Sequence, residues 1–262
     1  MPTRSPTLRR LRRLRAGMFF AALCLLPSAW ADEVRVLAAG AAKMAIERLA
    51  PAFERETGHQ LRATFDTVGA QRDRVLAAPT GTAADVVVLS AAALADLRRG
   101  ERLAPGPTVD IGLVAVALAV PASAAAPDIS TPQALDEALR TTPSIAYADP
   151  ARGATAGTHF ARVLDQLALR GALQGRLTVL PFGVDVIRAV SEGKFAMGVS
   201  QSSEILQHEG IRLVGPLPPP YALTTRYAAA AASDRAAARE LLRYFAGPAA
   251  QQAFRATGFL PE

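Results

Sequence analysis

The chain has 262 residues, of which 50% are hydrophobic and 20% charged, with a formal net charge of +6. The positive excess lies entirely in the first 15 residues, which hold six arginines and no acid. The rest of the chain balances 23 basic against 23 acidic residues. Net charge therefore gives no reason to expect binding to nucleic acid or to a membrane surface.

The first 31 residues have the pattern of a secretory signal peptide. The arginines are followed by the short apolar run AGMFFAALCLL and by a small-residue site ending at Ala31. The apolar run is shorter than the roughly 20 residues that span a bilayer. We predict cleavage after Ala31 and a periplasmic location, with an uncleaved anchor and a lipoprotein at Cys24 as alternatives and the export route left open. Cleavage removes the only cysteine, Cys24, and the only tryptophan, Trp30, so the remaining chain folds without disulfides.

From residue 32 onward, strand-like and helix-like segments alternate, which is typical of an α/β fold with mainly parallel sheets. Hydrophobic periodicity predicts strands at 34–39, 61–65, 84–89, 144–148, 177–182 and 196–200, and helices at 42–57, before 78, 132–140, 158–169, 184–192, 234–245 and 248–256. Residues 113–120 and 221–230 favour extended connections. A composition shift after Pro121 indicates a lobe boundary, and the run from Pro216 to Pro220 cannot enter a helix or a central strand.

Three glycine-containing turns join a strand end to a helix start, at residues 40–42, 67–70 and 153–158. Backbone amides at a helix N-terminus, with glycine allowing close approach, bind small anions. Because the turns are spread over both predicted lobes, we interpret them as the walls of an anion-binding cleft. The alternative is that they are the ordinary strand-end turns of an α/β protein.

Enzyme motifs are absent from the sequence. His59, His159 and His208 lie far apart and belong to no metal-binding or nucleophile motif. A secreted hydrolase is one alternative, with Ser200 to Ser203 and His208 or His159 as its only candidate residues. The ligand-sensing domain of a transcription regulator is another, although the sequence has no helix-turn-helix segment.

Six segments resemble the periplasmic molybdate-binding proteins of ABC transporters. In order they are AAGAAKMAIERLAPAFERETGHQ, ATFDTVGAQRDRVLAA, ADVVVLSA, ADPARGATAGTHFARVLDQL, EGKFAMGVSQSSEI and YFAGPAAQQAFRATGF. The resemblance implies an α/β, two-lobed type II periplasmic-binding-protein fold with two crossover connections and a central ligand cleft. It further implies a discontinuous lobe I, 32–112 plus 221–262, around a lobe II at 113–220. The resemblance also implies two partners for the protein, a small anionic ligand and the membrane permease of an ABC importer.

The chain departs from the resemblance where that family binds its oxyanion through serine and tyrosine hydroxyls. In this chain Ala41 occupies the position of that family's first serine, and Thr67 and Val68 occupy the positions of its serine pair. The position of its tyrosine lies near Gln201. Each lost neutral hydrogen bond costs about 0.5 to 1.5 kcal/mol, so we expect molybdate to bind less tightly here. Backbone amides at Ala41, Val68, Ala156 and Val184 keep their binding capacity, because they do not depend on the side chain.

Two arginines beside the turns, Arg72 and Arg152, point to a second ligand class. Guanidinium groups pair bidentately with carboxylates, which makes an organic di- or tricarboxylate the alternative to a molybdate-like oxyanion. We expect a monomeric, non-enzymatic extracytoplasmic solute-binding protein of an ABC importer that binds no nucleic acid, cofactor or resident metal. The candidate ligand-binding residues are Ala41, Thr67, Val68, Gly69, Arg72, Arg152, Thr155, Ala156, Val184 and Gln201.

Overall fold

The computed structural model describes residues 32–261. The predicted signal peptide, with Cys24 and Trp30, lies outside the described residues. Nine strands within 32–261 form one sheet in the order β2-β1-β3-β9-β4-β7-β5-β6, with β8 paired to β4. The strands are β1 (Glu33–Ala39), β2 (Gln60–Asp66), β3 (Val86–Ser90), β4 (Val109–Pro121), β5 (Ile145–Ala148), β6 (Leu177–Leu180), β7 (Met197–Gln201), β8 (Ile211–Pro216) and β9 (Thr224–Ala231).

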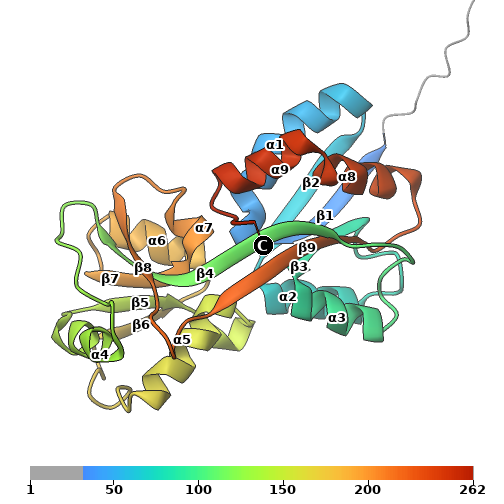
Figure 1. Ribbon diagram of the computed structural model, residues 1–262. Coiled ribbons are helices and arrows are strands. Elements are labelled where there is room, and N and C mark those ends of the chain that lie inside the picture. The colour runs from blue at the N-terminus through green and yellow to red at the C-terminus, as the bar shows by residue number, and fades with distance from the viewer. Residues whose placement is uncertain (1–31, 262) are drawn as a thin grey trace, which may run out of the picture.

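Helices cover this sheet on two separate lobes, which Figure 1 shows at the two ends of the long strand β4. Lobe I carries α1 (Lys43–Thr57), α2 (Val68–Ala77), α3 (Ala91–Arg99), α8 (Ala236–Ala246) and α9 (Pro248–Ala256). Lobe II carries α4 (Pro132–Thr141), α5 (Thr155–Gln166), α6 (Gly183–Ser191) and the single turn α7 (Ser202–Ile205). Short 3-10 turns, η1 (Gly40–Ala42) and η2 (Pro150–Arg152), precede α1 and α5.

Two extended segments cross between the lobes. The first half of β4 pairs with β9 from Val109 to Ala115, and its second half pairs with β7 and β8 from Val116 to Pro121. The return segment runs beside it, since Val116 N donates to Leu223 O before β9 begins. The expected two-lobed α/β fold with two crossover connections is therefore confirmed.

The hydrophobic core is divided in the same way. One cluster contains Val114 of β4 together with Tyr227 of β9 and the buried residues of lobe I. A second cluster begins at Val116 and packs α4 and α5 against the sheet of lobe II. The fully buried run of β3 lies between strands β1 and β9, as its continuous apolar sequence predicts. The exact lobe boundaries given above, at 112/113 and 220/221, stay a prediction.

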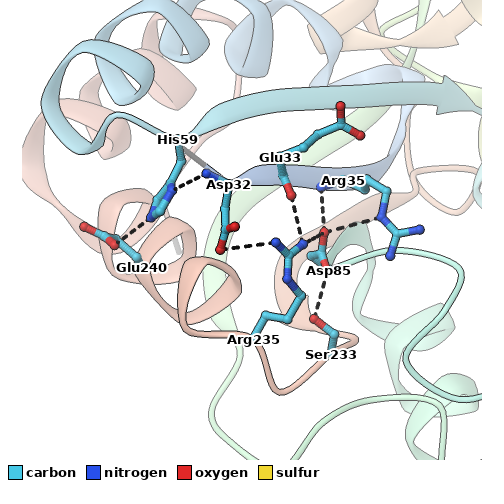
Figure 2. Close-up of polar contacts among 8 residues, drawn as sticks. All are labelled: Asp32, Glu33, Arg35, His59, Asp85, Ser233, Arg235 and Glu240. Carbon is cyan, nitrogen blue, oxygen red and sulfur yellow. Dashed lines mark hydrogen bonds and ion pairs between the residues drawn. The ribbon is translucent and has the colours of Figure 1, made fainter. Parts of the chain in front are cut away.

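A polar network anchors the amino ends of β1 and β3 to the loop before α8 (Figure 2). The buried Asp85 carboxylate accepts from Arg35 N at 2.8 Å, Ser233 Oγ at 3.0 Å and Arg235 Nη1 at 3.0 Å. Burial alone would raise the pKa of Asp85, but these hydrogen bonds and the Arg235 charge more than offset it and hold the pKa below its ordinary value. The ionised carboxylate thus joins the beginning of lobe I to the segment that returns to it.

Most predicted elements are present, with some differences. Helices α3 and α7 and strand β8 were not predicted, and α5 begins at Thr155 rather than Thr158. The N-cap of α5, Ala154, has no side-chain cap, so the sequence carries no polar start signal there. Gly157 instead allows the first turn of α5 to lie against Ala148 O, where a Cβ would collide.

Candidate functional site

A cavity of about 220 Å³ lies between the lobes. The carboxyl ends of the parallel strands β1, β2, β5, β6 and β7 converge on it, which is where ligands bind in open α/β sheets. Its walls combine apolar side chains with a few polar groups. The lining residues are Ala39, Gly40, Ala41, Lys43, Phe65, Asp66, Thr67, Val68, Ala148, Ala154, Thr155, Ala156, Phe182, Gly183, Val184, Ser200, Gln201, Glu204 and Tyr227.

The helices that begin at this cavity include α2 from lobe I, and α5 and α6 from lobe II. The first backbone N–H groups of a helix have no intrahelical acceptor, and the helix dipole places partial positive charge there. Val68, Ala156 and Val184 supply such groups in the first turns of the three helices. The cavity is therefore suited to negatively charged groups without a dedicated arginine in its wall.

The lobes touch at one edge of the cavity, where the turn before α2 meets the turn before α5. Gly69 N donates to Gly153 O at 3.1 Å, and the Thr67 hydroxyl donates to Arg152 O. A Cβ at Gly69 would lie 2.7 Å from Gly153 Cα, so only glycine permits this approach. We call residues 66–69 and 152–153 the latch.

An ion pair closes the same edge. Arg152 Nη2 lies 3.0 Å from Asp66 Oδ1, and its guanidinium lies 4.8 Å from the centroid of the Phe182 ring. Asp66 and Phe182 both line the cavity, and Arg152 packs behind them with 39% of its side chain exposed. The structure therefore gives Arg152 an acidic protein partner at the edge of the cavity.

Glu204, in the first turn of α7, is one of the two acidic side chains in the cavity wall. Its Oε2 accepts from the Ser200 hydroxyl and, at 3.4 Å, from Gln201 N. Gly40 and Gly183 flank the carboxyl so closely that a Cβ on either would collide with it. Burial raises the pKa of Glu204 above its ordinary value, although the hydrogen bonds from Ser200 and Gln201 act in the opposite direction.

Tyr227 of β9 forms the neighbouring part of the wall. Gln201 Nε2 donates to its hydroxyl oxygen at 3.3 Å. Burial and the Glu204 charge raise the pKa of Tyr227, and hydrogen bonds with Thr155 and Gln201 offset this only in part. The phenol therefore stays protonated and available as a hydrogen-bond donor at neutral pH.

The structure brings together seven of the ten residues proposed from the sequence as ligand contacts. The residues in the cavity wall are Ala41, Thr67, Val68, Thr155, Ala156, Val184 and Gln201. Gly69 and Arg152 lie in the latch beside it. Arg72 lies elsewhere, because its guanidinium pairs with Asp73 at 2.8 Å and with Asp96 at 3.6 Å. The role of all ten as ligand contacts stays a prediction.

Sequence reasoning missed Glu204, Tyr227, Lys43 and Asp66. Ser200 was considered only as a hydrolase nucleophile, yet its hydroxyl donates to Glu204. The two candidate histidines contact backbone oxygens instead of a serine. His159 Nε2 lies 2.7 Å from Tyr221 O, and His208 Nδ1 lies 2.9 Å from Glu209 O. No serine–histidine pair forms among the described residues. One sequence signal could have identified Glu204. It is an acidic residue four positions after Ser200, in the first helical turn after a buried strand.

The comparison with family models matches residues 34–260 to the bacterial extracellular solute-binding proteins. The chain belongs to this family.

Two solved structures share the fold of this solute-binding protein at low identity. The periplasmic molybdate-binding protein of Azotobacter vinelandii has a TM-score of 0.68 at 21% identity, covering 87% of this chain and 100% of its own. The sulfate-binding protein of Mycobacterium tuberculosis has a TM-score of 0.65 at 14% identity, covering 88% and 87%. The resemblance drawn from the sequence is confirmed for family and fold.

A relative corrects one expectation. The aconitate isomerase of Pseudomonas sp. is 31% identical over 96% of this chain and 97% of its own length. Since this relative is named as an enzyme, the expectation that the solute-binding protein has no enzymatic activity is wrong.

Among residues 32–261, no helix is both long and apolar enough to span a bilayer. In the same range, no group of three or more His, Cys, Asp or Glu side chains is placed to hold a metal ion.

Proposed function

We propose that this solute-binding protein is a periplasmic isomerase that binds an unsaturated tricarboxylate of the aconitate class in the cavity between its lobes. The observation that carries the proposal is the 31% identity to an aconitate isomerase over 96% of the chain. The cavity supports it, because three helix N-termini face a space that also contains a carboxyl group with a raised pKa.

The proposed binding mode uses backbone amides rather than arginine. The substrate's carboxylates would accept from the first-turn N–H groups of α2, α5 and α6, at Val68, Ala156 and Val184. These turns belong to different lobes, so a molecule with several carboxylates would engage both at once. Binding to both lobes favours the closed form.

A compact inorganic oxyanion suits the cavity less well. Three hydroxyls of its wall are already engaged, since Thr67 bonds to Arg152 O, Ser200 to Glu204 and Thr155 to Tyr227. The site residues thus favour the organic carboxylate over molybdate.

The test is direct conversion. The purified protein is incubated with trans-aconitate or with cis-aconitate, and the isomers are measured by proton NMR. We expect both reactions to reach the same ratio of isomers, and calorimetry to detect aconitate but not molybdate at low micromolar concentration. A folded protein that leaves both isomers unchanged would contradict the proposal.

A second candidate function is delivery of the bound carboxylate to an ABC permease. The crossing of both lobe connections near Val116 and Leu223 favours it, because such a pair of extended segments is suited to hinge closure around a ligand. Uptake of isotopically labelled aconitate by cells with and without the gene tests this function. Equal uptake would contradict it.

A further inference from the structure

We propose that Glu204 is the residue that moves the proton during isomerisation, with Ser200 positioning its carboxyl group and Tyr227 donating a hydrogen bond to the developing negative charge. This inference rests on the proposed function and assigns its chemistry to named residues. None of the three was a candidate for this role from the sequence.

The position of Glu204 carries the assignment. Its carboxyl lies in the cavity wall between the starts of η1 and α6, enclosed by Gly40 on one side and Gly183 on the other. Ser200 Oγ donates to Oε2, so this oxygen is fixed. Among residues 32–261 Glu204 takes part in no ion pair, which leaves its charge uncompensated by an arginine or lysine and its basicity intact.

The other ionisable groups facing the cavity are less suited to removing a proton. Asp66 already forms an ion pair with Arg152 at 3.0 Å, so its carboxylate is engaged within the protein. Lys43 is 46% exposed and lies 3.8 Å from Glu47. The Tyr227 phenol, whose pKa is raised by burial and by Glu204, stays protonated. The three histidines are absent from the cavity wall.

The reaction needs one group that accepts and returns a proton. Aconitate is propene-1,2,3-tricarboxylate, with a methylene carbon on one side of the central carbon and a vinylic carbon on the other. Ionised Glu204 would take a methylene proton, and the C–H electron pair would spread over the three carbons and their carboxylates. Return of the proton to the former vinylic carbon moves the double bond to the former single bond, whose conformation decides whether the product is cis or trans.

This scheme balances without an oxidant or a second substrate. One C–H bond breaks and one forms, and Glu204 ends ionised as it began. No rotation about a double bond is required, because the new double bond forms from a bond that was free to rotate. The burial that raises the pKa of Glu204 strengthens it as a base, and general acid–base catalysis works best when the pKa is near the working pH.

The decisive variant is Glu204→Gln, which keeps the side-chain shape and removes the basic oxygen. We expect calorimetry to find that aconitate binding is retained, while kcat falls by roughly 100- to 10,000-fold and substrate protons no longer exchange with deuterium oxide. Glu137→Gln is the matched control, because Glu137 lies exposed on α4. We expect it to leave turnover and exchange unchanged.

The Ser200→Ala variant separates a proton-transfer role from a structural one. The rate should fall as the pH drops below the pKa of Glu204, because the base must be ionised. Loss of the Ser200 hydrogen bond, which lowers that pKa, should move the acid limb of the kcat/KM profile to higher pH. Tyr227 and the charged groups Lys43 and Asp66 stay in place in this variant.

The outcomes distinguish the two proposals. If the wild-type protein does not interconvert the aconitates, the proposed function fails. If the wild-type protein turns over and Glu204→Gln keeps its kcat and its deuterium exchange, the function stands and the assignment of Glu204 is overturned. An acid limb that Ser200→Ala leaves unmoved likewise overturns the positioning role of Ser200.

Discussion

Replacing Gly69 by alanine should weaken ligand binding without weakening the fold. The new Cβ would lie 2.7 Å from Gly153 Cα and 3.0 Å from Arg152 O, both backbone atoms of the opposite lobe. Forcing extra volume into a packed contact costs about 1 to 3 kcal/mol. Separating the turns also removes the 3.1 Å bond from Gly69 N to Gly153 O, worth about 0.5 to 1.5 kcal/mol.

A penalty of about 2 kcal/mol on the closed form corresponds to a rise of about 30-fold in the dissociation constant. The same change lies within α2, where alanine is favoured over glycine by up to about 1 kcal/mol, so the melting temperature of the unliganded protein should not fall. Calorimetry with trans-aconitate measures the affinity, and small-angle X-ray scattering measures the compactness. The control is Gly171→Ala, because nothing lies within 4 Å of a Cβ at Gly171. If Gly69→Ala binds as tightly as the control and stays as compact, the latch does not contribute to closure.

Three further predictions concern charged side chains. Asp85→Asn should lower the free energy of unfolding by about 3 kcal/mol in urea titrations, whereas Asp234→Asn, at a side chain that is 77% exposed, should change it little. The pKa of Asp85 is lowered in the folded state. Its contribution to stability is therefore complete above the ordinary aspartate pKa and is lost as the pH falls through the folded value. The difference in unfolding free energy between wild type and Asp85→Asn should accordingly shrink in acid. The pKa of Glu204 is raised in the folded state, so wild-type stability should fall as the pH rises through that value. Glu204→Gln should then melt at a higher temperature than wild type in alkaline buffer and at the same temperature in acid. Arg152→Ala should weaken aconitate binding about fivefold through loss of the Asp66 and Phe182 contacts. Arg72→Ala should leave it unchanged, and an equal effect of both arginine variants would contradict the placement.

The alternation of strands and helices could be predicted because it is a local property. The buried run of β3 and the apolar spacing of α1 appear directly in the sequence. A polar cap lies at the predicted start of α4, where Thr131 accepts from the backbone. Where such a local signal was missing, as at the uncapped start of α5, the predicted boundary was displaced.

The site could be predicted only as far as it depends on local chain geometry. Turns that join a strand end to a helix start expose backbone amides whatever their side chains are, so Ala41, Val68, Ala156 and Val184 were found. Arg72 and Arg152 looked equivalent in the sequence because each is adjacent to a glycine turn. Their positions in the fold differ because Arg72 pairs with Asp96, whereas Arg152 pairs with Asp66 in the cavity wall. No local sequence pattern identifies those partners.

Most of the elements, the anion-binding turns and the family resemblance could be predicted from local patterns, since each depends on residues that are neighbours along the chain. Which groups share the cavity depends on how distant segments pack together. Glu204, Ser200 and Tyr227 meet there because β7 and β9 both lie beside β4, and the pKa of Glu204 is raised because the surrounding lobes bury it. Burial and long-range proximity are properties of the packed molecule, which is why a sequence that indicated a binding cleft did not reveal Glu204 in its wall.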